Sequence, residues 1–135
     1  MFNSCLIKFK TFDNKYGELV PIEGLKDIPF EIKRVYYITN VDEGIVRGHH
    51  AHRKLHQVVI CIKGSCTMKL DNGNSEEEIN LCRNNVGLYI GPYIWREMYN
   101  FSEDCVLLVL ASDYYTEEDY IRNYDFYLKE VEGRF

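Results

Sequence analysis

The stretch "QVVICIKGSCTMKLDNGN", residues 57–74, decides the fold class, because it contains two predicted strands and the turn that follows them. Its first part is apolar on both faces, as in a strand buried between two layers. The next part alternates, with Cys66, Met68 and Leu70 on one face and polar side chains on the other. The closing "DNGN" predicts a hairpin turn, since Asn-Gly can adopt positive φ.

Similar strand-like runs fill most of the chain, and turns recur about every 8–12 residues, which is typical of an all-β sandwich or barrel. Only the tail looks helical: Thr116 and Asp119 form a T-x-x-D capping pattern, and "EEDYIRNY", 117–124, can make two helical turns. We therefore expect one domain, residues 1–135, with a small jelly-roll β-barrel and a C-terminal helical extension. The expected strands are 5–9, 17–24, 35–39, 57–64, 65–70, 77–81, 86–91, 96–101 and 105–112.

Composition excludes several classes of protein. The chain has 135 residues, of which 46% are hydrophobic, enough for a core without disulfides or metal. A net charge of −5 argues against general binding to nucleic acid or to anionic membranes. Five cysteines, an odd number with no C-x-x-C pair, predict buried, reduced thiols. With no signal-like start and no membrane-length apolar run, we expect a soluble, cytoplasmic protein.

All four histidines lie within "RGHHAHRKLHQ", residues 47–57. If this segment is extended, His50 and His52 point to one face and His49 to the other. A His-x-His pair inside a barrel predicts either a metal site or a proton-transfer site, and an exposed strand is the remaining alternative. An imidazole has an ordinary pKa near 6.5, which suits proton transfer at neutral pH.

The spacing around this pair resembles the first motif of the cupin superfamily, G-x5-H-x-H-x3-4-E-x6-G. The matching residues are Gly44, His50, His52, Gln57 and Gly64. Gln57 stands where cupins have a metal-binding glutamate. The resemblance implies a jelly-roll barrel with the histidines inside it.

The second cupin motif, P-x-G-x-x-H, is altered as well. The corresponding "PYIWRE", residues 92–97, has Glu97 in place of the histidine. A divalent metal usually needs three or more N, O or S ligands, so we expect no metal. The alternative is a two-histidine, one-carboxylate site made by His50, His52 and Glu97, as in a metal-dependent dioxygenase.

A closer resemblance is to the dTDP-4-keto-6-deoxyglucose 3,4-ketoisomerases. The segment 47–66 resembles their R-G-x-H-A-H-[KR] block, and the segments 16–24, 33–39 and 90–98 resemble further parts of that family. The resemblance covers roughly residues 5–115 and is collinear. It implies a metal-free, cofactor-free cupin that acts on a dTDP-linked ketosugar and pairs as a homodimer through its N-terminal strand and barrel face.

The chemistry of such an enzyme explains the residue types. A ketone at C4 makes the C3 hydrogen acidic, and removing that proton gives an enediolate. The resemblance assigns His52 as the first choice for the base and His50 as the second member of the pair. Tyr37 and Arg96 are expected to donate hydrogen bonds to the enediolate oxygens.

The remaining assignments concern substrate binding. Arg34 and Arg47 are expected to bind the diphosphate, because a guanidinium binds phosphate oxygens bidentately, although each arginine could equally form a surface ion pair. Gln57 is assigned to the substrate site. Tyr16 and Arg96 are expected to flank the sugar ring, and this pair resembles the pattern that gives a gluco-configured product rather than a galacto-configured one.

Three other functions remain open at this point. A 3,5-epimerase acting on the same sugar also uses a histidine base, a dioxygenase would need a metal, and some cupins bind sugar nucleotides without catalysis. The ketoisomerase product would be a natural substrate for an aminotransferase that makes a 3-amino-3,6-dideoxyhexose.

Overall fold

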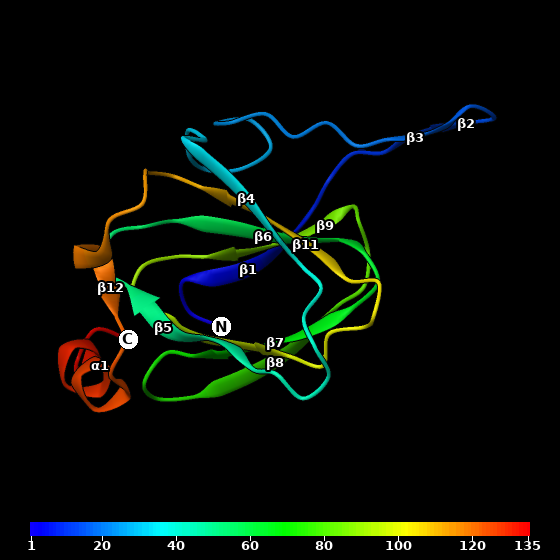
Figure 1. Ribbon diagram of the computed structural model, residues 1–135. Coiled ribbons are helices and arrows are strands. Elements are labelled where there is room, and N and C mark those ends of the chain that lie inside the picture. The colour runs from blue at the N-terminus through cyan, green and yellow to red at the C-terminus, as the bar shows by residue number, and fades with distance from the viewer.

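The computed structural model, which describes residues 1–135, contains two antiparallel five-stranded sheets that face each other in a jelly-roll arrangement (Figure 1). One sheet has the strand order β1-β9-β6-β11-β4 and the other β12-β5-β10-β7-β8, with no ladder closing them into a single barrel. The first sheet comprises β1 (Ser4–Lys8), β9 (Val86–Ile90), β6 (Gln57–Lys63), β11 (Val106–Ala111) and β4 (Arg34–Thr39). The second comprises β12 (Tyr120–Ile121), β5 (Arg47–His52), β10 (Trp95–Tyr99), β7 (Cys66–Asp71) and β8 (Glu76–Leu81). The predicted all-β fold is confirmed.

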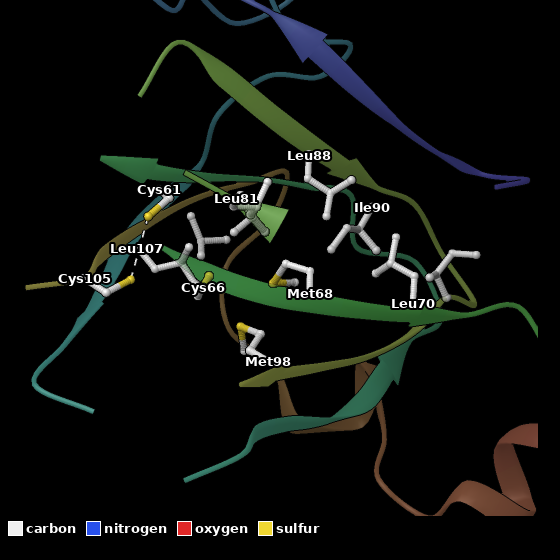
Figure 2. Close-up of a cluster of buried hydrophobic side chains, with 13 residues drawn as sticks. Cys61, Cys66, Met68, Leu70, Leu81, Leu88, Ile90, Met98, Cys105 and Leu107 are labelled. Atoms are coloured by element: carbon white, nitrogen blue, oxygen red, sulfur yellow. Dashed lines mark hydrogen bonds between the residues drawn. The ribbon is translucent and has the colours of Figure 1, made fainter. Parts of the chain in front are cut away.

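The main core lies between the sheets, where thirteen side chains are buried (Figure 2). The alternation predicted for the second strand of the opening stretch is confirmed, because Cys66, Met68 and Leu70 all point inward and are fully buried. Leu88 and Ile90 of β9 meet them from the opposite sheet. Burying a side chain of this size contributes about 1.5–3 kcal/mol, so this layer is the main source of stability.

The β7–β8 hairpin is also confirmed. Its register runs from Cys66 opposite Leu81 to Asp71 opposite Glu76. Gly73 in the connecting turn has φ 91°, a conformation that favours glycine.

The cysteines agree with the prediction only in part. Cys61, Cys66 and Cys105 are buried, whereas Cys5 and Cys82 are exposed, and all five are free thiols. Cys5 is an exposed residue of β1, and Cys82 directly follows the end of β8.

The helical tail differs from the prediction. Thr116 is extended and its side chain caps nothing, and only a short 3-10 turn, η1 (Glu117–Asp119), follows it. Tyr120–Ile121 then pairs with β5 as β12, so no helix can continue through this segment. The real helix, α1 (Tyr124–Val131), begins later and is capped by the side chain of Asn123.

Helix α1 covers the outer face of the second sheet beside β5 and β12 (Figure 1). It forms the smallest of three buried clusters, in which Tyr127 and Val131 pack with Ala51, Trp95 and Ile121. No helix of the structure has the length and apolar character required to cross a membrane. The helix thus buries the back of the histidine strand and leaves the inner face of that strand to the site.

The N-terminal hairpin, β2 (Phe12–Asn14) and β3 (Gly17–Leu19), projects from the body of the molecule (Figure 1). The predicted strand 17–24 is therefore shorter than expected. All residues of both strands are exposed, and Tyr16 in the turn between them is 87% exposed. The hairpin forms an arm on which the large apolar side chains Phe12, Tyr16 and Leu19 are exposed within this chain.

Candidate active site

A β-bulge in β5 sets the directions of the histidine side chains. Arg96 of β10 pairs with His50, and the register shifts immediately beyond that pair, so that His49 becomes an extra residue. Gly48 and His49 both have positive φ, 96° and 54°. A Cβ atom at Gly48 would lie 2.8 Å from the carbonyl oxygen of Arg96, so only glycine fits there.

His50 and His52 therefore share the inner face of β5, as predicted, with ring centroids 4.9 Å apart. The ring of Tyr120 packs against both, at 4.9 Å from His50 and 4.3 Å from His52. The Nδ1 of His50 lies 2.9 Å from the carbonyl oxygen of Gly48, and the Nδ1 of His52 lies 3.1 Å from Oδ2 of Asp119. The Nε2 of His52 is buried and has no hydrogen-bond partner.

Both imidazoles are neutral at neutral pH. Burial, followed by the positive charge of Arg96, lowers the pKa of His50 to about 3. The same two causes lower the pKa of His52 further still, and His52 is 1% exposed. A neutral imidazole has a free lone pair, which is the form that can accept a proton.

Asp119 was not predicted as part of the site. Its Oδ1 accepts the backbone N–H of Lys54 at 2.8 Å, and its Oδ2 accepts that of Leu55 at 3.2 Å, beside the bond to His52. In the sequence Asp119 appears only as a helix-capping residue. It is 67 positions from His52, and no local pattern connects the two.

Arg96 is a buried cation without a buried anion. It is 3% exposed, it donates from Nη1 to Oε1 of Gln57 at 2.5 Å, and its Nε and Nη2 donate to the carbonyl of Ile94. No carboxylate forms an ion pair with it. Burial lowers the pKa of Arg96 to about 10, which shows how poorly this position solvates a charge.

Gln57 extends this arrangement to a tyrosine. Its Nε2 donates to the hydroxyl oxygen of Tyr36 at 2.9 Å, which leaves the hydroxyl proton of Tyr36 available for another partner. Burial raises the pKa of Tyr36, so the hydroxyl stays protonated. Arg96, Gln57 and Tyr36 thus form a continuous row of donors.

Tyr36, and not the predicted donor Tyr37, lies on the inner face of β4. Side chains of β4 alternate, with Arg34 and Tyr36 on the inner face, whereas Tyr37 is 70% exposed. Because of this alternation, Tyr37 points away from the histidine pair, and the prediction that placed it at the site is corrected. Because Arg34 was also predicted to face the site, the alternation itself could have shown that Tyr37 does not.

Of the residues predicted to bind the diphosphate or to flank the sugar ring, only some lie near the histidine pair. Arg34 lines a cavity of about 90 Å³ with His52, and its Nε is buried without a partner. Arg47 is exposed at the start of β5, and Tyr16 lies on the projecting arm. The cavity is lined by Arg34, His52, Lys54, Leu55, Ser112, Asp113, Tyr114, Thr116, Asp119 and Tyr120.

Glu97 does not join the histidine pair. It accepts a hydrogen bond from Nε1 of Trp95 at 3.0 Å and lies 3.9 Å from Nδ1 of the outward-facing His49. The inward residue of β10 is Arg96, so the comparison of Glu97 with the cupin histidine is corrected. The alternative triad of His50, His52 and Glu97 does not form, and no three His, Cys, Asp or Glu side chains gather as a metal site.

Several known proteins are similar to this chain in sequence and in fold. A protein of Aneurinibacillus thermoaerophilus named TDP-4-oxo-6-deoxy-alpha-D-glucose-3,4-oxoisomerase is 54% identical over 126 residues, 93% of this chain and 91% of that protein. The 3,4-ketoisomerase QdtA of Thermoanaerobacterium thermosaccharolyticum, solved as a His-to-Asn mutant with TDP-4-keto-6-deoxyglucose, is 60% identical with a TM-score of 0.98. That match covers 100% of this chain and 98% of QdtA.

The TDP-quinovose 3,4-ketoisomerase WlaRB of Campylobacter jejuni is 47% identical with a TM-score of 0.92, over 96% of this chain and 99% of that one. The family model described as "FdtA: WxcM-like, C-terminal" matches residues 2–132. The chain therefore belongs to this FdtA family, and it is an isomerase of the sugar 3,4-ketoisomerase type with a cupin fold.

Proposed function

We propose that this protein converts dTDP-4-keto-6-deoxyglucose into a dTDP-3-keto-6-deoxyhexose. The observation that carries the proposal is a pair of neutral, inward-facing histidines beside a buried arginine that has no counter-ion. The names of the relatives support the substrate, since QdtA was solved with this ketosugar in a His-to-Asn variant. QdtA numbers run one higher at the tyrosine and arginine that match Tyr16 and Arg96, so the altered histidine corresponds to His50.

In the proposed reaction one imidazole removes the proton from C3. The electrons of the C3–H bond form a C3–C4 double bond, and the carbonyl electrons move to the C4 oxygen to give the enediolate. A proton is then delivered to C4, the C3 hydroxyl loses its proton and becomes the new carbonyl, and the C4 oxygen takes up a proton and becomes the new hydroxyl. Protons and electrons balance, so the rearrangement needs no oxidant or reductant.

His52 remains our first choice for the base. Its Nδ1 is engaged by Asp119 and its Nε2 has no partner, as expected for a lone pair kept for a proton. His50, whose Nδ1 donates to a backbone carbonyl and whose ring is more exposed, is the second member that orients the sugar or redelivers the proton.

Arg96 and Tyr36 are the proposed donors to the enediolate. An uncompensated buried cation costs free energy in the empty site and recovers it when negative charge develops beside it. Removing one preorganised donor of this kind typically costs about 100–1,000-fold in kcat. Gln57 holds both donors in place.

We propose that the reaction proceeds without a metal. Gln57 is a neutral amide where cupins have a metal-binding carboxylate, and Arg96 places a positive charge on the inner face of β10. A fixed cation repels a divalent ion, and two histidines alone are too few ligands for a tight site.

We propose a homodimer in which a second copy completes the site. The cavity of about 90 Å³ is much smaller than the roughly 300–1,000 Å³ of small-molecule sites. The projecting arm exposes Phe12, Tyr16 and Leu19, and Tyr16 can flank a sugar ring only if the arm reaches another subunit. Arg34 is the proposed diphosphate contact, and the exposed Arg47 can take part only at that subunit boundary.

The free thiols favour a reducing compartment, the cytoplasm.

Tyr16 and Arg96 favour the gluco product, and the similarity to an enzyme named for TDP-quinovose supports this choice. The product would supply an aminotransferase that makes a 3-amino-3,6-dideoxyhexose.

NMR of the product formed from dTDP-4-keto-6-deoxyglucose tests the proposal. A carbonyl at C3 with a large H4–H5 coupling is expected, a small coupling would indicate the galacto product, and deuterium at C3 and C5 without carbonyl migration would indicate an epimerase.

A further inference from the structure

We propose that Asp119 is a positioning residue that fixes His52 in the tautomer with its proton on Nδ1, so that the bare Nε2 faces the reaction. The inference rests on the proposed function only in taking His52 as a proton-transferring residue. The tautomer itself is a property of the protein and can be measured without substrate.

The first step is to establish whether Asp119 donates or accepts the hydrogen bond with His52. Both oxygens of Asp119 already accept backbone N–H groups, Oδ1 from Lys54 at 2.8 Å and Oδ2 from Leu55 at 3.2 Å. The side chain is thereby fixed as an acceptor, and at 3.1 Å from Oδ2 the Nδ1 of His52 must be the donor. A neutral ring that donates from Nδ1 has its lone pair on Nε2.

The second step is how the C-terminal segment holds Asp119 in place. The backbone N–H of Arg53 donates to the carbonyl of Asp119 at 3.0 Å. The Nη1 of Arg53 donates to the carbonyls of Glu118 at 2.9 Å and Tyr120 at 3.1 Å, one on each side of Asp119. Glu130 of α1 holds the same guanidinium through Nη2 at 2.7 Å and Nε at 3.2 Å. The helix therefore ties the 118–120 segment to the histidine strand.

The third step is the environment of Nε2. This atom is buried without a partner, and such atoms are rare in folded proteins unless function requires them. The rings of His50 and Tyr120 pack against the imidazole. Three nearby cations, Arg34, Arg96 and Arg122, disfavour its protonation together with burial, and the one anion in contact with the ring, Asp119, lies on the Nδ1 side. The imidazole is thus kept neutral, and the lone pair on its Nε2 stays enclosed and available for an acidic C–H of the substrate.

Asp119→Asn is the decisive variant, because two backbone donors limit how the amide can turn. Keeping the shorter Lys54 bond places the carbonyl oxygen at Oδ1 and the NH2 group opposite His52. His52 can then only accept at Nδ1, and the ring proton moves to Nε2. In serine-protease triads the same exchange gives the wrong tautomer and lowers kcat about 10⁴-fold.

The test combines ¹⁵N NMR of the histidine rings with kinetics on the full-length protein. With four histidines in the chain, the signals of His52 are assigned by their loss in His52→Asn. We expect Nδ1–H in the wild type, Nε2–H in Asp119→Asn, and a kcat lowered on the order of 10²–10⁴-fold with KM changed by no more than about threefold. Asp125→Asn, the same exchange at an exposed position with no hydrogen bond, should change neither the tautomer nor kcat.

An Nε2–H tautomer in the wild type would overturn the proposal without any variant, so it stays testable even if Asp119→Asn folds poorly. So would a wild-type tautomer in Asp119→Asn, or a changed tautomer with an unchanged kcat in a protein whose His52→Asn variant has lost its kcat. If instead His52→Asn keeps its kcat while the tautomers behave as expected, the base assignment in the proposed function fails and the positioning by Asp119 stands.

Discussion

Mild acid should destabilise this protein through its site histidines. The pKa of His50 is lowered to about 3 and that of His52 is lowered further, both mainly by burial, whereas an unfolded histidine titrates near 6.5. Between these values the unfolded state binds protons that the folded state does not, so the free energy of unfolding falls as the pH falls.

The size of the effect follows from the same linkage. Each such histidine costs almost nothing at about pH 7.5 and about 1.4 kcal/mol at about pH 5.5. The pair together should therefore remove about 2.7 kcal/mol over this interval. The lowered pKa values of Glu117, about 2, and of Glu130 act only below the ordinary carboxyl pKa near 4.5, outside the interval.

Urea unfolding at the two pH values, at one fixed protein concentration, measures the loss. His50→Asn and His52→Asn should each reduce the pH-dependent loss by about half. His56, whose pKa is also lowered by burial, is present in every variant and cancels in the comparison. An equal loss in the wild type and in both variants would refute the conclusion that these rings are held neutral.

Three further predictions concern the reaction. His52→Asn should lower kcat on the order of 10²–10⁴-fold while leaving dTDP affinity within a few-fold, and a wild-type kcat would transfer the base role to His50. Tyr36→Phe should lower kcat by about 10²-fold or more, whereas the matched Tyr37→Phe on the outer face should not, and the reverse order would restore the prediction made from the sequence. Activity should survive exhaustive chelation, and loss to a chelator with recovery on adding a divalent metal would show that Gln57 and its neighbours do bind a metal after all.

The local patterns of the chain were sufficient for the fold class. Alternation in the segment 65–70 placed Cys66, Met68 and Leu70 in the core, and the Asn-Gly turn predicted the β7–β8 hairpin. The same alternation placed His50 and His52 together on one face. These features depend on neighbours in sequence, because the pleat of a strand has a period of two residues whatever surrounds it.

The chemistry around the histidines depended on tertiary structure. Whether Tyr36 or Tyr37 faces inward depends on which side of β4 meets the core, and Arg96 rather than Glu97 faces inward across a bulge that the local pattern does not show. The assignment of Asp119 to a helix cap failed because a distant strand provides better partners for that carboxylate and for the backbone that follows it. A side chain's local pattern limits its direction, but its hydrogen-bond partners are chosen in three dimensions, among groups far apart in the chain.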